Sequence, residues 1–366
     1  MPHPISISRR ALLGAPAVFA ACRSRRSFSG YAFVANYDGP SVAAVDLTSF
    51  SVSKQIPLDQ KPSWLLAAPD RPAVYAVCRS GPVFEIDARK LQVVRRVAMP
   101  GPVVGARISP QGTLWTLSRE ARLLSSLDGQ RIKLPAPPDD FDIDSTGRLA
   151  AIASAQSNSM ALCDLTGKTG IRQLTASGDP RMVRFRSDGE SFLAANRATR
   201  ILSIVDTATA KLVVNLSLPI EPVEICQKPD GGEIYLSGIG MDAVVVVYPY
   251  NTEIAETILA GRGPAAMAAV ANPGYLLVTN PAPGDLTIID MNTRKLVASM
   301  HVGQDPRAVV VTPDGQYALV LNQVSGNMAV ILLGDLTQRR HKLDPPPLFT
   351  MISVGPTPVS AAIVRV

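Results

Sequence analysis

Histidine is scarce in this chain, and many metal and catalytic centres depend on it. Only His3, His301 and His341 occur among 366 residues, and the first lies in the N-terminal segment. Two further histidines cannot assemble a His-rich copper, iron or zinc site. Neither stands in a nucleophile motif and Gly-x-Ser-x-Gly is absent, which argues against a Ser–His–Asp hydrolase. We therefore expect no metal and no cofactor, and the sequence names no catalytic residue.

Cysteine is also rare, with Cys22, Cys78, Cys163 and Cys226 as the four examples. No C-x-x-C or C-x-x-C-H spacing occurs, which argues against a zinc ribbon, a thioredoxin-type site and c-type haem attachment. Cys78, Cys163 and Cys226 lie within apolar, strand-like segments. They are expected to be small buried hydrophobic residues.

Charge is sparse too, since charged residues make up 18% of the chain against about 25% in an average soluble domain. The net charge of +6 comes from dispersed Lys and Arg residues, without a basic stripe flanked by aromatic residues. This pattern argues against a nucleic-acid partner. Gly (26) and Pro (31) are plentiful and scattered, which favours many short strands joined by turns over long helices.

Residues 1–22 have the features of an export signal. Arg9 and Arg10 are followed by an uncharged apolar stretch, 11–21, that is too short to span a bilayer as a helix. The end of this stretch, Phe-Ala-Ala-Cys22, resembles a bacterial lipoprotein signal, and Ser8-Arg-Arg-Ala-Leu-Leu13 resembles a twin-arginine signal. We expect an exported protein, either periplasmic or anchored to the outer membrane by lipid on Cys22. Simple cleavage to a soluble periplasmic product is the alternative.

The rest of the chain, after a linker at 23–30, is a repeat with a period of 42 residues. Three independent series of residues share this period, which makes chance similarity implausible. The series are Pro180, Pro222, Pro264 and Pro306; Asn196, Gly238, Asn280 and Asn322; and Asp164, Asp206, Tyr248 and Asp290.

One unit, residues 275–316, shows the content of the repeat. It holds four short runs rich in β-branched residues, which are predicted strands, and it ends in the turn Pro313-Asp314-Gly315. Four short strands in about forty residues make one blade of a β-propeller. The sequence therefore predicts an all-β propeller of four-stranded antiparallel blades, as a single domain over residues 31–366.

The residues Tyr275-Leu-Leu-Val-Thr-Asn, Ile-Ile-Asp290, Val302-Gly-x-x-Pro306 and Pro-Asp-Gly315 resemble the YVTN-type β-propeller repeat. The resemblance covers essentially residues 31–366. It implies the propeller fold and leaves the function open, because one fold hosts many functions.

The number of blades follows from counting copies. The first strand of each copy is expected to begin near Tyr31, Val74, Leu114, Leu149, Phe192, Ile234, Tyr275 and Tyr317. These eight copies predict eight blades, with seven as the alternative because the second and third copies are degenerate. The last run, 359–366, has no later copy to join. It is expected to pair with the first copy and close the ring, which removes exposed sheet edges.

Acidic residues recur in the repeat, and most have a structural interpretation. Aspartates that follow an apolar strand in six copies are expected to cap the next turn with their own side chains. They are Asp46, Asp87, Asp128, Asp164, Asp206 and Asp290. Asp140, Asp142 and Asp144 alternate along one predicted inner strand and its turn. A structural role is favoured for these three over a cation site, because calcium-loop ligands are missing at two positions.

Functional residues are expected where they break the repeat, at the channel mouth where loops of all blades converge. The tentative ligand-binding residues are Lys61, Asp179, Arg181, Arg262, Asp305 and Arg307. Several arginines in one ring could hold an anion through bidentate hydrogen bonds. The alternative is local pairing of Asp179 with Arg181 and of Asp305 with Arg307.

The function predicted on these grounds is an exported, envelope-associated propeller that acts as a binding or scaffold module for a protein or a small anionic ligand. It is expected to be a monomer that meets the membrane only through a lipid anchor. Two alternatives stay open: a propeller hydrolase similar to the lactonases, and an accessory subunit of a periplasmic dehydrogenase. The scarcity of His weakens the hydrolase hypothesis.

Overall fold

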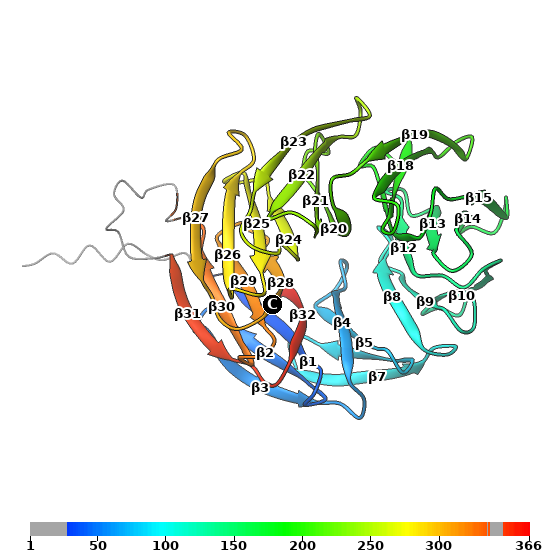
Figure 1. Ribbon diagram of the computed structural model, residues 1–366. Coiled ribbons are helices and arrows are strands. Elements are labelled where there is room, and N and C mark those ends of the chain that lie inside the picture. The colour runs from blue at the N-terminus through cyan, green and yellow to red at the C-terminus, as the bar shows by residue number, and fades with distance from the viewer. Residues whose placement is uncertain (1–27, 335, 337–346) are drawn as a thin grey trace, which may run out of the picture.

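Apolar runs bounded by turn residues form the strands of this protein. The unit predicted at 275–316 is not one blade, because its last strand, Pro306–Val311, is the inner strand of the next sheet. Each copy supplies three strands of one sheet and the inner strand of the following sheet. The computed structural model describes residues 28–334, 336 and 347–366. In these residues the strands make eight four-stranded antiparallel sheets, the blades, which stand in a ring (Figure 1). The prediction of eight blades is confirmed, and each copy begins within one residue of its expected position.

The four strands of each blade are given below in order from the middle of the ring to its outside. Blades 1 to 4 consist of β32 (Pro358–Arg365), β1 (Gly30–Asn36), β2 (Ser41–Asp46) and β3 (Ser51–Pro57); β4 (Pro62–Ala67), β5 (Ala73–Cys78), β6 (Pro82–Asp87) and β7 (Gln92–Ala98); β8 (Val103–Ile108), β9 (Leu114–Ser118), β10 (Leu123–Ser126) and β11 (Arg131–Lys133); and β12 (Asp140–Ile143), β13 (Leu149–Ser154), β14 (Ser159–Asp164) and β15 (Ile171–Thr175).

Blades 5 to 8 follow the same order. They consist of β16 (Pro180–Phe185), β17 (Ser191–Asn196), β18 (Ile201–Asp206) and β19 (Lys211–Ser217); β20 (Glu221–Gln227), β21 (Ile234–Ile239), β22 (Ala243–Tyr248) and β23 (Glu253–Leu259); β24 (Met267–Val270), β25 (Tyr275–Asn280), β26 (Asp285–Asp290) and β27 (Leu296–His301); and β28 (Pro306–Val311), β29 (Tyr317–Asn322), β30 (Asn327–Leu332) and β31 (Leu348–Ser353).

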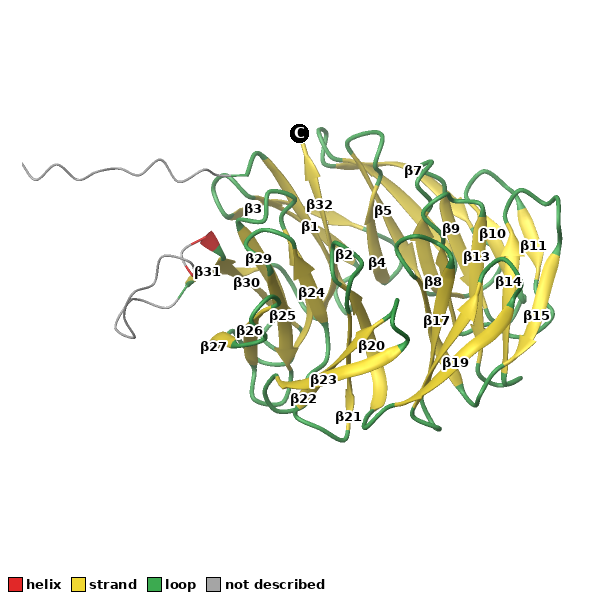
Figure 2. Cartoon of the chain, turned by 90° about the horizontal axis from the view of Figure 1, so that it is seen from above, coloured by secondary structure: helices red, strands yellow, loops and turns green. Residues whose placement is uncertain are grey.

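The ring is closed by the C-terminal strand, as predicted. β32 pairs antiparallel with β1, from Gly30 opposite Arg365 to Asn36 opposite Pro358. One blade therefore contains both the first and the last strand of the described chain, which lie side by side in Figure 1 and again in the view from above in Figure 2.

The hydrophobic core is divided among the blade interfaces. Eight clusters of buried side chains exist, one between each pair of neighbouring blades, so each blade buries both faces of its sheet. Phe33 and Val74, for example, lie in the cluster between blades 1 and 2. Cys78 and Cys163 are free and buried, and Cys226 is free and partly buried, so Cys78 and Cys163 are confirmed as buried core residues.

The innermost strands leave one edge without a neighbouring strand and line a channel along the ring axis. Residues along them alternate between burial in a blade interface and partial exposure: Leu65, Val183 and Ile225 are buried, whereas the next residues, Leu66, Arg184 and Cys226, are partly exposed. We call the end of the channel at which the inner strands begin the entry mouth. It is formed by the loops before each inner strand and after each second strand.

Two neighbouring blades are irregular at the entry mouth. In blade 6 the pairing of β21 with β22 covers only Ile234, Tyr235 and Leu236. In blade 7 the inner strand β24 is four residues long, like β12 of blade 4, against six in β4 and β28. Both irregularities remove regular backbone from the same part of the mouth.

Some sequence-based predictions lie outside the described residues. These are the export signal at 1–22 with Cys22, most of the linker, and His341 in the last insert. Within the described residues, no helix is long and apolar enough to cross a membrane.

Candidate functional site at the entry mouth

The residues predicted for the channel mouth form separate local pairs. Lys61, in the loop before β4, places its Nζ 3.1 Å from Oδ1 of Asp38 and 4.8 Å from the centre of the Tyr37 ring. Both members of the ion pair are about half exposed. An exposed pair of this kind contributes little to stability, so Lys61 is held loosely at the rim.

Asp179 and Arg181 belong to a larger network. Nε of Arg181 lies 2.9 Å from Oδ1 of Asp179, and its Nη1 lies 3.3 Å from Oδ1 of Asp139. Asp139 also pairs with Arg119 and accepts a hydrogen bond from the backbone N–H of Ala155 at 2.7 Å. Since the side chain of Asp139 is only 5% exposed and has several donors, this network joins blades 3, 4 and 5 at the mouth.

Asp305 and Arg307 form the third pair, with Nε of Arg307 2.7 Å from Oδ1 of Asp305. Arg262 is exposed in the loop before β24 and forms no ion pair with any described residue. No hydrogen bond or ion pair between described residues joins Lys61, the Asp179–Arg181 pair and the Asp305–Arg307 pair. The structure therefore leaves these predicted residues in separate groups around the mouth.

A pocket of about 690 Å³ opens between blades 6 and 7 at the entry mouth. We call it the mouth pocket. Its volume lies in the range typical of small-molecule sites. Its fourteen lining residues are Arg197, Val223, Gly238, Ile239, Gly240, Met241, Asp242, Gly263, Pro264, Ala265, Pro281, Ala282, Asp305 and Arg307.

Blade 6 departs from the repeat where the mouth pocket lies. In four other copies an Asn stands at the end of the second strand, and Gly238 replaces it in blade 6. A Cβ atom on Gly238 would lie 2.2 Å from the carbonyl oxygen of Glu221, so no larger residue fits without moving backbone. The backbone of Glu221 occupies the place of the missing side chain, and the β21–β22 pairing is lost at the same end of blade 6.

The mouth pocket carries one unpaired cationic side chain. Arg197 follows β17, is exposed, and forms no ion pair with a described residue. The charge of Arg307 is balanced by Asp305. Oδ1 of Asp242 accepts a hydrogen bond from the backbone N–H of Gly263 at 3.1 Å. The exposed Arg262 precedes Gly263 in the sequence but does not line the pocket, so Arg197 is the lining cation that has no ion pair with a described residue.

Below the mouth, one half of the channel wall is charged. On consecutive inner strands β8, β12, β16 and β20 the partly exposed positions hold Arg107, Asp140, Asp142, Arg184 and Glu224. The equivalent positions of the other blades hold small or apolar side chains, such as Leu66, Ala268 and Val310. We call these five residues the charged wall. The charges cluster in blades 3 to 6, so this side of the channel differs chemically from the other.

Most side chains of the charged wall form ion pairs with one another. Asp140 lies between two guanidinium groups, 3.2 Å from Nη2 of Arg107 and 2.6 Å from Nη1 of Arg184. Nε of Arg107 is also 3.8 Å from Asp142. Asp144, the third carboxylate of this segment, accepts hydrogen bonds from the backbone N–H groups of the turn that follows. The structural interpretation of this run of aspartates therefore agrees with the geometry.

Glu224 is the exception in the charged wall, because its carboxyl forms no hydrogen bond or ion pair with a described residue. Burial in the narrow channel raises the pKa of Glu224, and Arg184 opposes this rise. Burial likewise raises the pKa of Asp142 and lowers that of Arg107. The pKa of Arg184 is raised, since the nearby carboxylates outweigh the effect of its burial.

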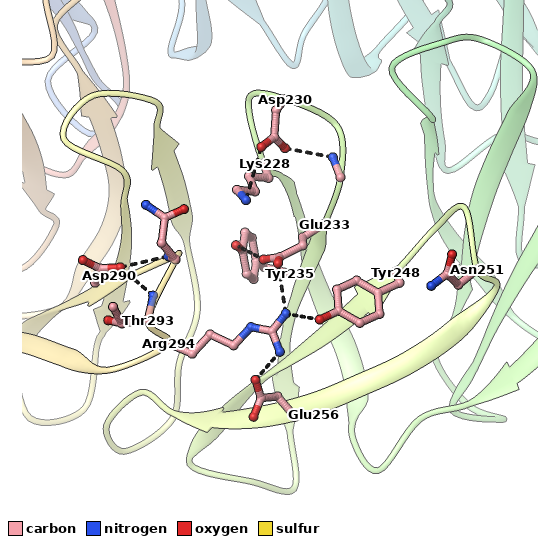
Figure 3. Close-up of polar contacts among 12 residues, drawn as sticks. Lys228, Asp230, Glu233, Tyr235, Tyr248, Asn251, Glu256, Asp290, Thr293 and Arg294 are labelled. Carbon is pink, nitrogen blue, oxygen red and sulfur yellow. Dashed lines mark hydrogen bonds and ion pairs between the residues drawn. The ribbon is translucent and has the colours of Figure 1, made fainter.

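A second cluster of charged residues lies at the opposite end of the blades. Figure 3 shows Arg294 of blade 7 reaching toward Glu233, Tyr248 and Glu256 of blade 6. Its Nη2 is 3.0 Å from Oε1 of Glu233, and Oε2 of the same carboxylate accepts a hydrogen bond from the hydroxyl of Tyr235 at 2.5 Å. Every charged group here has a partner, so this cluster fastens two blades and offers no free group to a ligand.

Five of the six recurring aspartates cap turns, as predicted. The prediction is wrong for Asp128, because in that turn the hydroxyl oxygen of Ser126 accepts the hydrogen bond, from the backbone N–H of Gln130. Asp87, for example, accepts hydrogen bonds from the backbone N–H groups of Arg89 and Lys90 at 2.8 and 2.9 Å, and these hydrogen bonds lower its pKa. The same arrangement occurs at Asp46, Asp164, Asp206 and Asp290.

Sequence reasoning missed Arg197 and the charged-wall residues Arg107, Arg184 and Glu224. A signal for the pocket was present, because Gly238 interrupts a series of asparagines. A signal for the charged wall was present as well, because Arg184 stands inside a strand whose counterpart, Val310, lies in an unbroken apolar run. Neither signal shows by itself which residues meet in space.

Comparisons with known proteins show the fold and no family. No family model matches the chain, and no curated protein matches it. Among solved structures, hydrazine synthase of Kuenenia stuttgartiensis matches at 20% identity with a TM-score of 0.59, over 74% of this chain and 95% of that one. Dihydro-heme d1 dehydrogenase NirN in complex with DHE matches at 16% identity with a TM-score of 0.70, over 88% and 74%. These similarities support the propeller fold.

Proposed function

We propose that this chain is a binding module that takes a small anionic ligand in the mouth pocket. The observation that carries the proposal is the unpaired guanidinium of Arg197 beside a pocket of ligand size. Arg donates parallel hydrogen bonds that match a carboxylate or phosphate. The remaining charges of the pocket are engaged with each other or with backbone, so an anion would meet Arg197.

The binding proposal is favoured over hydrolysis by the placement of the only described histidine. His301 lies on the outermost strand β27, where its Nδ1 is 3.3 Å from Asp285. No described histidine belongs to the mouth pocket or the charged wall. A lactonase-like reaction would need an acid–base group at the pocket. The one lining carboxyl outside the Asp305–Arg307 pair is that of Asp242, which accepts a hydrogen bond from the backbone N–H of Gly263.

Two neighbours of this fold carry enzyme titles, a synthase and a dehydrogenase, and one of these is titled as a complex with DHE. A ligand site within the propeller is therefore compatible with the fold. The accessory role in a periplasmic dehydrogenase remains an alternative proposal. A pull-down with this chain that recovers a redox enzyme from periplasm would favour that alternative, provided that variants of the mouth pocket recover the enzyme equally well.

The binding proposal is tested by isothermal titration calorimetry of the full chain with inorganic phosphate and with citrate. We expect saturable binding of at least one of the two, and a loss of about tenfold or more in affinity in Arg197→Gln, because a hydrogen bond to a charged group contributes about 1.5–3 kcal/mol. Arg131→Gln is the matched control, since Arg131 is exposed on the outer strand β11, outside the mouth. Equal affinities for both anions in Arg197→Gln and the unaltered chain would reject Arg197 as the anchor.

Export is a separate part of the proposal and rests on residues 1–22. The product would be periplasmic, or anchored to the outer membrane through lipid on Cys22. Mass spectrometry of the N-terminus of protein purified from a bacterial membrane fraction tests both. A diacylglyceryl adduct on Cys22 that Cys22→Ser abolishes would support anchoring, and an intact Met1 would reject export by this signal.

A further inference from the structure

The mouth pocket is unusually apolar for a rim lined by solvated loops. Seven of its fourteen lining residues are Val, Ile, Met, Pro or Ala. Ile239 is 52% exposed and Val223 is 40% exposed, and the two belong to the ends of neighbouring strands β21 and β20. Large apolar side chains this exposed in one concave place mark a binding surface more often than scattered ones do.

The apolar side chains replace polar ones found at the same repeat positions. At the position of Ile239, the last residue of β21, blades 2, 3, 5 and 8 carry Arg79, Arg119, Arg197 and Gln323. At the position of Val223, blades 4, 5 and 8 carry Asp139, Arg181 and Arg307. Blade 6 therefore differs from blades 5 and 8 in two adjacent places, and both differences expose hydrocarbon to solvent within the pocket.

The cation and the apolar surface lie on different sides of the same pocket. Arg197 comes from blade 5, whereas Ile239, Met241 and Pro264 come from blades 6 and 7. A ligand that satisfies both surfaces needs an anionic group at one end and an apolar body that covers the floor. A hydrophilic anion such as phosphate would leave Ile239 and Val223 exposed.

We propose that the mouth pocket selects an amphiphilic carboxylate, in which one carboxylate meets Arg197 and a flat apolar body lies over Ile239 and Val223. This inference rests on the proposed binding function and names the class of its ligand. Burial of the apolar body supplies binding free energy in proportion to the area covered. The carboxylate fixes the orientation of the ligand through the guanidinium.

The test uses four probes on the full chain by isothermal titration calorimetry: 2-naphthoate, 2-naphthylmethanol, acetate and inorganic phosphate. We expect 2-naphthoate to bind at least tenfold more tightly than the other three. Ile239→Ser should weaken 2-naphthoate about tenfold and leave acetate unchanged. Arg197→Gln should weaken 2-naphthoate by a similar factor and leave 2-naphthylmethanol unchanged.

The matched control for Ile239→Ser is Leu212→Ser, because Leu212 is 48% exposed on the outer strand β19, outside the mouth. Ile239 is a surface residue, and a melting temperature equal to that of the control establishes that the variant is folded. If acetate or phosphate binds as tightly as 2-naphthoate, or if Ile239→Ser binds it like the unaltered chain, the inferred ligand class is wrong while anion binding stands. If Arg197→Gln binds every anion like the unaltered chain, the proposed function fails as well.

Discussion

Asp142 on β12 accepts a hydrogen bond from the backbone N–H of Phe185 on β16, with 2.8 Å between N and Oδ2. The two residues belong to neighbouring blades, and the N–H lies on the strand edge that no other strand pairs. An unpaired backbone donor in a narrow channel costs free energy unless a side chain accepts its hydrogen. The same device recurs where Asp140 accepts from Val183 at 3.2 Å and Ser360 from Leu65 at 3.0 Å.

This relationship predicts that Asp142→Ala destabilises the protein more than Asp142→Asn does. Alanine removes the acceptor for Phe185 and a carboxylate beside Arg107, whereas asparagine keeps an oxygen at the same place. We expect the free energy of unfolding to fall by about 2–3 kcal/mol in the alanine variant and by no more than about 1 kcal/mol in the asparagine variant. Urea denaturation at pH 7 measures both, and equal losses would contradict the role as an acceptor.

Ring closure gives a second prediction. β32 is the inner strand of blade 1 and buries Ala362 and Val364 in the interface with blade 2. Removing residues 359–366 would expose that cluster and the edge of β1. We expect the melting temperature to fall by about 10 °C or more, since the loss of one core strand amounts to several kcal/mol.

The control for this truncation is deletion of Val366 alone, which is 45% exposed and lies after the strand. Its melting temperature should match that of the full chain. Differential scanning calorimetry distinguishes the two, and an unchanged transition in the eight-residue truncation would show that β32 does not hold the ring together.

The propeller architecture could be predicted from the sequence because the sequence pattern of the blade occurs in eight copies. Because each apolar run and each turn repeats, a strand that is hard to recognise in one copy can be placed by comparison with the others. The start of β25 at Tyr275 was predicted in this way, without any knowledge of packing. A site is built once. Arg197 and Ile239 lie 42 residues apart at equivalent positions of adjacent blades, and only the ring geometry shows that both line one pocket.

The charged wall is a second example of side chains whose contacts could not be predicted from the sequence. Asp140 and Asp142 were recognised in the sequence as an unusual run, but their partners Arg107 and Arg184 lie on the two adjacent blades. Charge pairing across blade interfaces depends on which strand positions face the channel. That direction is set by the twist of each blade and by the register shifts in strands such as β8 and β16, which composition does not report.

A third prediction concerns the asparagines of the repeat. Nδ2 of Asn322 donates a hydrogen bond to the carbonyl oxygen of Val302 at 2.7 Å and so ties the end of β29 to the loop that leads into its own blade. Asn36 makes the same bond to Val354 at 2.8 Å. Because Asn322 is fully buried, we expect Asn322→Ala to lower the free energy of unfolding by about 1–3 kcal/mol.

The loop itself is shaped for this bond, since Gly303 has a φ of 138° and a Cβ there would lie 2.5 Å from Nδ2 of Asn322. Asn251→Ala is the control, because Asn251 is exposed and only bonds Glu253 at 3.4 Å. Urea denaturation should place the control within about 0.5 kcal/mol of the unaltered chain. If Asn251→Ala lowers the free energy of unfolding as much as Asn322→Ala does, the hydrogen bond between Asn322 and Val302 does not contribute specifically to stability.

The fourth prediction follows from the unpaired carboxyl of Glu224 in the charged wall. Burial raises its pKa above the ordinary 4.5, with Arg184 and Arg107 opposing and Asp140 supporting the rise. A raised carboxyl pKa means that the folded protein binds this proton more tightly than the unfolded chain does. At low pH Glu224 therefore does not lower the free energy of unfolding. The free energy of unfolding falls as the pH rises from about the pKa of Glu224 in the unfolded chain to its pKa in the folded protein.

Glu224→Gln removes that ionisation, so the variant should be more stable than the unaltered chain at pH 8 and equal to it at pH 4. Urea denaturation at pH 4, 6 and 8 measures the difference in the free energy of unfolding, which should grow with pH and then level off. Glu120→Gln is the matched control, because Glu120 is exposed at a turn and its replacement measures the effect of removing a carboxyl outside the charged wall. If the unaltered chain instead gains stability over Glu224→Gln as pH rises, the Glu224 carboxylate is stabilised by Arg184 more than it is penalised by burial, and the wall holds a true ion pair at that position.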